Sequence, residues 1–136
     1  MWTYLLTPAV YDTDALGHVN NTRMPQWFER ARDPVFEIFT PDLGWEHWRI
    51  IIARIEVDYE AQISYGTDVE IRTWIEKIGH TSFTVHHECR QHDVVAAVGK
   101  AVLVNYDFQN KRPVPLTEAD RAALREHLMD GNGGTS

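Results

Sequence analysis

The chain has 136 residues, of which 43% are hydrophobic and 24% are charged, which is typical of one soluble globular domain. Its formal net charge of −7 argues against general nucleic-acid binding, and no hydrophobic run approaches the ~20 residues that span a membrane. The single cysteine, Cys89, excludes an intrachain disulfide, and the lack of a basic region before the first hydrophobic residues predicts a cytoplasmic protein without a signal peptide.

The chain begins with an alternating segment. Residues 1–6 place Trp2, Tyr4 and Leu6 on one face, and this spacing predicts a strand. Residues 12–21 contain aspartate, glycine and asparagine without a periodic pattern, so they are expected to form a loop.

A long helix is predicted for residues 22–39, because hydrophobic side chains recur there at helical spacing. The hydrophobic stripe consists of Trp27, Ala31, Val35 and Ile38, and Phe28 and Phe39 lie beside it. Asn20 and Asn21 are candidates for the helix N-cap. Pro34 removes one backbone hydrogen bond and is expected to kink or interrupt the helix.

Four strands and a short helix are predicted to follow. The strands cover residues 49–60, 68–78, 81–91 and 94–108. The last of them is almost continuously apolar, which indicates burial on both faces. Thr117 is the expected N-cap of a short C-terminal helix. We therefore predict a single domain over residues 1–129 and a flexible tail over residues 130–136.

This order of elements favours an α+β domain, in which an antiparallel five-stranded sheet wraps around one long helix. A sheet has two faces, and one helix covers only one of them. Because residues 94–108 are apolar on both sides, a second subunit is the simplest cover for the other face. A homo-oligomer is thus expected.

The segment from Tyr11 to Asn21 carries the residues best suited to chemistry. It places two carboxylates, one imidazole and two amides just before the predicted helix. Free N–H groups at a helix start can stabilise an oxyanion, and Asp14 can act as a nucleophile or as a general base on water. Gly17 permits a tight turn or a close approach to a ligand. The alternative is structural, because Asp and Asn often cap helices and form turns.

The sequence resembles the hotdog-fold acyl-CoA thioesterases of the 4-hydroxybenzoyl-CoA thioesterase type over about residues 3–113. The resemblance is carried by Asp14-x-x-Gly17-His18-Val19-Asn20-Asn21 followed by Trp27-Phe28-Glu29-x-Ala31-Arg32, by Val57-Asp58-Tyr59-Glu60-x4-Tyr65-Gly66-Thr67-Asp68-Val69, and by Ile78-Gly79-His80-Thr81-Ser82-Phe83. It implies a hotdog fold, to which the short C-terminal helix read from the sequence is added, and hydrolysis of acyl-CoA thioesters to a free acid and CoA. It also implies a homodimer with a shared sheet, which in this family often assembles into a tetramer as a dimer of dimers, with the active site at the dimer interface.

The resemblance places the catalytic aspartate at Asp14 and the backbone oxyanion donor at the N–H of Asn21. It leaves open whether the aspartate attacks directly or activates water. CoA would be part of the substrate, so no separate cofactor is expected. Membrane and nucleic acid are not expected partners. The segment Glu60-Ala61-Gln62 lacks a proline that many members have, and the His18-Val19-Asn20-Asn21 form leaves aryl specificity undetermined.

Further side chains are candidates for the site. His18 can position the substrate or hold the turn, and Asn20 can orient water or cap the helix. For substrate binding the candidates are Gly17, Thr81, Ser82 and Arg90. No metal site is expected.

The histidines of the predicted strand over residues 81–91 argue against a metal site. His86 and His87 are adjacent in the strand and point to opposite faces, so they cannot easily share one ion. Cys89 is interpreted as buried filling rather than a nucleophile.

Two other functions fit parts of the pattern. An enoyl-thioester hydratase or dehydratase would use Asp14 and His18 to move protons, and a non-catalytic module would only bind acyl thioesters. The sequence does not determine acyl length, or whether CoA or an acyl carrier protein carries the thioester.

Overall fold

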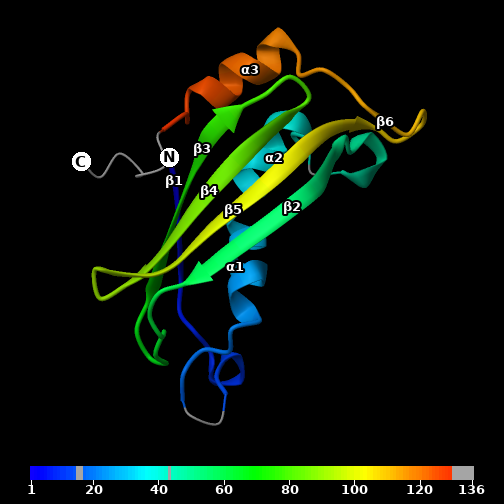
Figure 1. The fold of residues 1–136 in the computed structure, drawn as a ribbon. Helices are drawn as coiled ribbons and strands as arrows, with labels where there is room; N and C mark the ends of the chain where they lie inside the picture. The colour runs from blue at the N-terminus through cyan, green and yellow to red at the C-terminus, as the bar shows by residue number, and fades with distance from the viewer. Residues whose placement is uncertain (15–16, 43, 130–136) are drawn as a thin grey trace.

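One antiparallel sheet and three α-helices make up the computed structural model, which describes residues 1–14, 17–42 and 44–129 (Figure 1). The long strands are β1 (Trp2–Leu6), β2 (Ile50–Tyr59), β3 (Val69–Ile78), β4 (Ser82–Gln91) and β5 (Val94–Asp107). The helices are α1 (Arg23–Ala31), α2 (Asp33–Phe39) and α3 (Glu118–Arg125). Short 3-10 turns are η1 (Val10–Asp12) and η2 (Trp45–His47), and β6 (Arg112–Pro113) is a two-residue strand. The predicted tail, residues 130–136, lies outside the described residues.

The sheet has the strand order β1-β3-β4-β5-β2, with β6 added to the end of β5. All of these pairs are antiparallel. Figure 1 shows α1 and α2 lying end to end along one face of the sheet, while α3 lies at one end of it. The predicted α+β architecture, with its sheet around a helical layer and a short C-terminal helix, is therefore confirmed. Among the described helices, none is long and apolar enough to cross a membrane.

The helical layer is broken where the sequence predicted a defect. The α1 helix ends at Ala31, and α2 begins at Asp33 with Pro34 in its first turn. Proline has no N–H to donate and is tolerated only in that first turn, which explains the interruption. The predicted stripe was wrong at one position. Phe28, which was expected beside the stripe, is buried, whereas Trp27, which was expected within it, is only half-buried.

A glycine in the sheet explains the position of Phe28. A Cβ atom added to Gly99 of β5 would lie 2.5 Å from Cε2 of the Phe28 ring. The ring also stacks on His87 of β4, with the two centroids 4.8 Å apart. The absence of a side chain at Gly99 thus lets α1 lie close to the sheet, and this contact fixes the helix whose start faces the loop of Asp14.

A buried polar chain joins the helical layer to the sheet at the break between α1 and α2. Arg32 is 1% exposed, and its Nη1 lies 3.2 Å from Nε2 of His87. The Nδ1 of His87 lies 2.9 Å from the hydroxyl of Thr73. An arginine only donates, so Nε2 accepts and Nδ1–H donates to Thr73, which requires a neutral imidazole.

We expect the stability of the protein to fall as the pH drops below ~6.5, the ordinary pKa of histidine. Burial, and next the Arg32 cation, hold the pKa of His87 well below its ordinary value. Below that pH, the unfolded chain binds a proton at this histidine that the folded chain does not. The free energy of unfolding therefore falls by up to about 1.4 kcal/mol per pH unit for this group. Urea unfolding at pH 7 and pH 5 measures this loss.

The His87→Gln variant should lose part of this pH dependence, whereas His92→Gln, at the exposed β4–β5 turn, should retain it. An equal slope in His87→Gln and the unmodified protein would contradict the assignment.

Candidate active site

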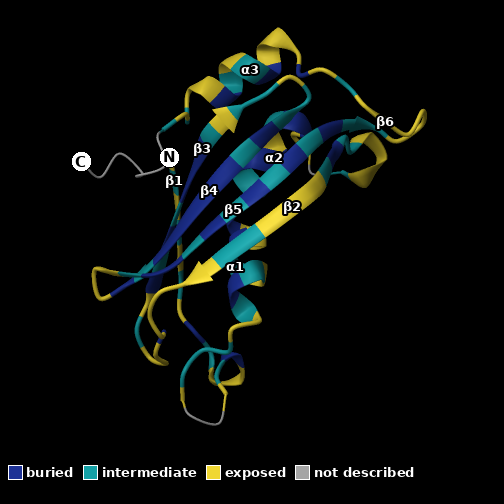
Figure 2. Cartoon of the chain, in the orientation of Figure 1, coloured by how far each residue is buried: buried dark blue, intermediate teal, exposed yellow. Residues whose placement is uncertain are grey.

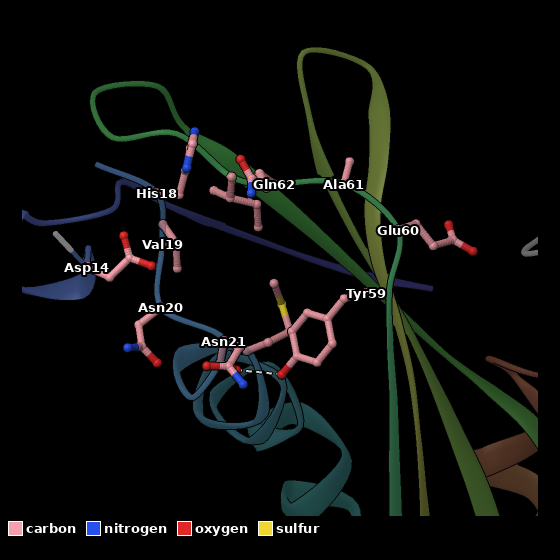
Figure 3. A pocket seen from close by; sticks show the side chains of 11 residues that line it. Asp14, His18, Val19, Asn20, Asn21, Tyr59, Glu60, Ala61 and Gln62 are labelled. Carbon is pink, nitrogen blue, oxygen red and sulfur yellow. Dashed lines mark hydrogen bonds between the residues drawn. The ribbon is translucent and has the colours of Figure 1, made fainter. Parts of the chain in front are cut away.

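A pocket of about 410 Å³ opens between the loop before α1 and the chain that follows β2 (Figure 3). It brings together four of the predicted site residues, Asp14, His18, Asn20 and Asn21, although β2 lies far from them in sequence. The remaining lining residues are Val19, Met24, Tyr59, Glu60, Ala61, Gln62 and Ile63.

The loop that carries Asp14 is closed by main-chain hydrogen bonds. The Asp14 N–H donates to the carbonyl of His18 at 2.9 Å, and the Gly17 N–H donates to the carbonyl of Asp14 at 3.1 Å. Gly17 has a φ of +80°, a conformation that glycine adopts without strain, so the predicted tight turn is confirmed. Figure 3 shows the Asp14 carboxylate extending from this turn toward the segment of Val19 and Asn20.

The same loop is attached to the chain beyond β2. The Val19 N–H donates to the carbonyl of Ile63 at 2.8 Å. Ser64 is in turn held by the buried side chain of Gln91, which accepts from the Ser64 N–H at 2.8 Å and donates to the Ser64 carbonyl at 2.9 Å. A second donation from Gln91, to the carbonyl of Thr67 at 3.0 Å, completes this Gln91 clamp. The far wall of the pocket is thus fixed by the end of β4.

The helix start is organised by Asn20 and Thr22. The Asn20 Oδ1 accepts from the Thr22 N–H at 2.9 Å and from the Thr22 hydroxyl at 2.8 Å. The capping alternative for Asn20 is therefore realised in part, although the N-cap position itself belongs to Thr22. Within the described ranges, no hydrogen bond uses the Asn21 N–H, which is the predicted oxyanion donor.

Tyr59 is a pocket residue that the sequence reasoning missed. Its hydroxyl donates to the carbonyl of Asn21 at 2.5 Å and so ties the end of β2 to the start of α1 (Figure 3). Burial raises the pKa of this hydroxyl, which keeps it protonated and able to donate. The alternation in residues 55–60 gave the face of Tyr59, but only the tertiary structure brings it to Asn21.

His18 contributes to the loop through its main chain. Its carbonyl accepts the Asp14 N–H, and an isolated bridge pairs His18 with Ser64. The Nδ1 atom of its imidazole is buried and has no hydrogen-bond partner in the part of the chain that is described. The turn is thus held by the backbone of His18, and a role of its ring in substrate binding stays a prediction.

The four predicted substrate-binding residues are not among the residues that line this pocket within one subunit, although Gly17 belongs to the loop that carries Asp14. Thr81 and Ser82 are at the β3–β4 turn, where the Gly79 N–H donates to the carbonyl of Ser82 at 2.7 Å. Arg90 is near the end of β4 and forms an ion pair with Glu88 at 2.7 Å. Their roles in binding stay predictions.

The geometric expectations for the β4 histidines and cysteine are confirmed. His87 faces the helices, whereas His86 faces the other side and stacks on Trp74 with centroids 4.4 Å apart. Cys89 is fully buried, and burial raises the pKa of its thiol to about 12. A neutral thiol is a poor nucleophile, so Cys89 serves as core packing.

Comparisons with known proteins identify relatives of the chain. A model of the thioesterase-like superfamily matches residues 8–124. The chain is 47% identical to a structure described as a predicted thioesterase from Bacillus stearothermophilus, with a TM-score of 0.92 and coverage of 95% of this chain and 97% of the other. It is 33% identical to a thioesterase from Thermus thermophilus complexed with coenzyme A and Zn, with a TM-score of 0.81 and coverage of 91% of each chain.

A more distant structure shares the fold. It is a 1,4-dihydroxy-2-naphthoyl-CoA thioesterase from Synechocystis, 17% identical, with a TM-score of 0.76 and coverage of 91% of this chain and 95% of the other. No curated protein matches the sequence significantly.

Proposed function

The chain belongs to the thioesterase-like superfamily and is an enzyme that hydrolyses thioesters, and from this premise we propose that it cleaves acyl-CoA to a free acid and CoA with Asp14 as the reacting carboxylate. The observation that carries the proposal is the pocket in which Asp14 shares a wall with the start of α1. Hydrolysis at this site requires no separate cofactor, since CoA is part of the substrate.

The thioester carbonyl is assigned to the start of α1. The N-terminus of a helix carries a partial positive charge, and its first N–H groups lack partners within the helix. Asn21 lines the pocket directly before the N-cap residue Thr22, and its N–H is assigned to supply the hydrogen bond to the oxyanion at this positive end of α1. The Tyr59 hydroxyl holds the Asn21 peptide from its carbonyl side, which fixes the direction of the next peptide in the helix start.

Asp14 acts on the carbon of that carbonyl by one of two balanced routes. As a nucleophile, its carboxylate bonds to the carbon, the C–S bond breaks, and CoA leaves as a thiolate; water then hydrolyses the mixed anhydride. As a general base, it takes a proton from water, whose oxygen attacks the same carbon, and the thiolate leaves from the tetrahedral intermediate.

His18 and Asn20 are assigned to orienting the substrate and the attacking group. His18 lines the pocket, and its ring has a buried Nδ1 without a partner among the described residues, which is the group assigned to hydrogen-bond the substrate. The Asn20 Oδ1 is engaged by Thr22, which leaves its amide N–H groups to donate to water or to the carboxylate.

The assignment of CoA as the thiol carrier and the assignment of a dimer are supported by separate observations. A relative that is 33% identical has been crystallised with coenzyme A. The β2 strand is the last strand of the sheet, so one side of its backbone has no partner strand among the described residues. A second copy that pairs there would place the Asp14 pocket beside the interface, because Tyr59 at the end of β2 lines that pocket.

A thiol-release assay over a panel of acyl-CoA and acyl carrier protein thioesters tests the proposal. We expect free CoA and the carboxylic acid as the only products from an acyl-CoA. Release of thiol from carrier-protein thioesters alone would refute the CoA assignment. With an enoyl-CoA substrate, formation of a 3-hydroxyacyl thioester without thiol release would instead support the hydratase alternative.

A further inference from the structure

The β2 strand is an exposed sheet edge with apolar side chains that its own helices do not cover. Ile52, Ile55 and Tyr59 are on the helix side of the sheet, since they lie opposite buried residues of β5. Ile55 is nevertheless 47% exposed. Figure 2 shows most of β2 as exposed, whereas its neighbour β5 alternates between buried and intermediate residues. A long apolar edge of this kind is a template for pairing with another strand.

The charges of β2 make this edge complementary to a second copy of itself. Arg54 and Glu56 face the outer side of the sheet and pair with each other within one strand. If two copies pair antiparallel with Ile55 opposite Ile55, each Arg54 lies opposite the partner's Glu56. A shift of the register by two residues keeps every side chain on the same face of the sheet, but it places Arg54 opposite Arg54 or Glu56 opposite Glu56. Like charges directly opposite each other are destabilising.

This register determines which segments of the two copies meet. In an antiparallel pair, the start of one β2 lies beside the end of the other. The residues before Ile50 therefore approach the partner's residues after Tyr59, which form a wall of the pocket of Asp14. The η2 turn ends at His47, only a few residues before β2, so it reaches this position.

Trp45 in η2 is the side chain that the pairing brings to the pocket. It is 83% exposed, more than any other large hydrophobic side chain among the described residues. We propose that Trp45 of each copy forms a wall of its partner's Asp14 pocket and contacts the apolar acyl group of the bound thioester. This inference rests on the proposed function, since it assigns a residue to the same site.

The chemistry of η2 favours the acyl group over the CoA moiety. Glu46 follows Trp45 in the same turn, and its negative charge would repel the phosphates of CoA. Trp45 presents a large and flat apolar surface, and it lies in the same segment as Trp48, which packs on Phe36 with ring centroids 5.0 Å apart. This segment thus offers an apolar wall anchored to the core.

Steady-state kinetics of Trp45→Ala test the contact. We expect the KM for a long-chain or aryl acyl-CoA to rise about ten-fold, a loss that fits removal of one buried aromatic contact, and the KM for acetyl-CoA to stay nearly constant. Trp45→Phe should restore most of the affinity. The matched control is Leu5→Ala, which removes a side chain that is 65% exposed on β1, at the opposite edge of the sheet. Equal KM changes for acetyl-CoA and the larger substrates would overturn the acyl assignment.

Mixed dimers test whether Trp45 acts across the interface. Differently tagged Asp14→Asn and Trp45→Ala chains are co-expressed and the heterodimer is purified. If Trp45 serves the partner's site, one of the two sites of each heterodimer regains both side chains, and that site shows the KM of the unmodified enzyme. If Trp45 acts within its own chain, the heterodimer retains only the raised KM, which overturns the inference.

The proposed function and the role of Trp45 are refuted by different results. An unmodified enzyme that releases no thiol, or an Asp14→Asn variant with full turnover, contradicts the proposed function. A functional enzyme that sediments as a monomer, or a heterodimer with only the raised KM, leaves the thioesterase assignment intact and refutes the role of the partner's Trp45.

Discussion

The Asp14→Asn variant is expected to lose about 10²- to 10⁴-fold in kcat for acyl-CoA hydrolysis while retaining its fold. Asparagine has nearly the same shape as aspartate, but it cannot take a proton from water or form the mixed anhydride. The turn around Asp14 is closed by its main-chain N–H and carbonyl, which the substitution leaves in place. Thiol-release kinetics measure the loss, and circular dichroism with thermal melting checks the fold.

Glu60→Gln is the matched control for this experiment. Glu60 lines the same pocket and is the other carboxylate there, but Figure 3 shows its side chain extending away from Asp14. We expect this variant to keep turnover within a few-fold of the unmodified enzyme. If Glu60→Gln were inactive and Asp14→Asn active, the assignment of the reacting carboxylate would have to be reversed.

The Gly99→Ala variant is expected to lose about 1–3 kcal/mol of unfolding free energy. The added Cβ would lie 2.5 Å and 2.6 Å from two carbons of the Phe28 ring, which is closer than packed atoms allow. Phe28 cannot move away freely, because it is buried against His87. Either α1 shifts or the ring strains, and urea unfolding at pH 7 measures the loss of stability.

A double mutant separates this steric effect from other causes. In a Phe28→Leu background the smaller side chain leaves room for the Cβ, so adding Gly99→Ala should cost less there than in the unmodified chain. Additive losses would show that the contact with Phe28 is not the source of the destabilisation. Because Phe28 lies in the helix that starts at the pocket, the KM of Gly99→Ala also reports whether a shift of α1 reaches the site.

The elements that could be predicted from sequence are those set by local pattern. The alternation in residues 68–78 and 81–91 gave β3 and β4 to within one residue, since residues on one face of a half-buried strand repeat every second position. Pro34 marked the end of one helix and the start of another because its effect on the backbone is local. Gly17 likewise marked the turn beside Asp14.

The features that could not be predicted depend on contacts between distant segments. The buried stripe of α1 runs through Phe28 rather than Trp27 because Gly99, far along the chain, leaves space there. Tyr59 enters the pocket only because β2 ends beside the start of α1. Thr81 and Ser82 are candidates to line the site from a neighbouring strand, and within one subunit the fold places them at the β3–β4 turn.

The Gln91 clamp has a consequence for engineering the substrate range. Its amide is hydrogen-bonded to the backbone of Ser64 and Thr67, so the hairpin that joins β4 to β5 supports one side of the binding cavity. Lengthening that hairpin, a common way to diversify a surface, would displace Gln91 and so disturb the cavity, even though no inserted residue touches the ligand. Libraries that keep Gln91 and vary the lining directly are therefore better suited to changing acyl preference without losing the enzyme.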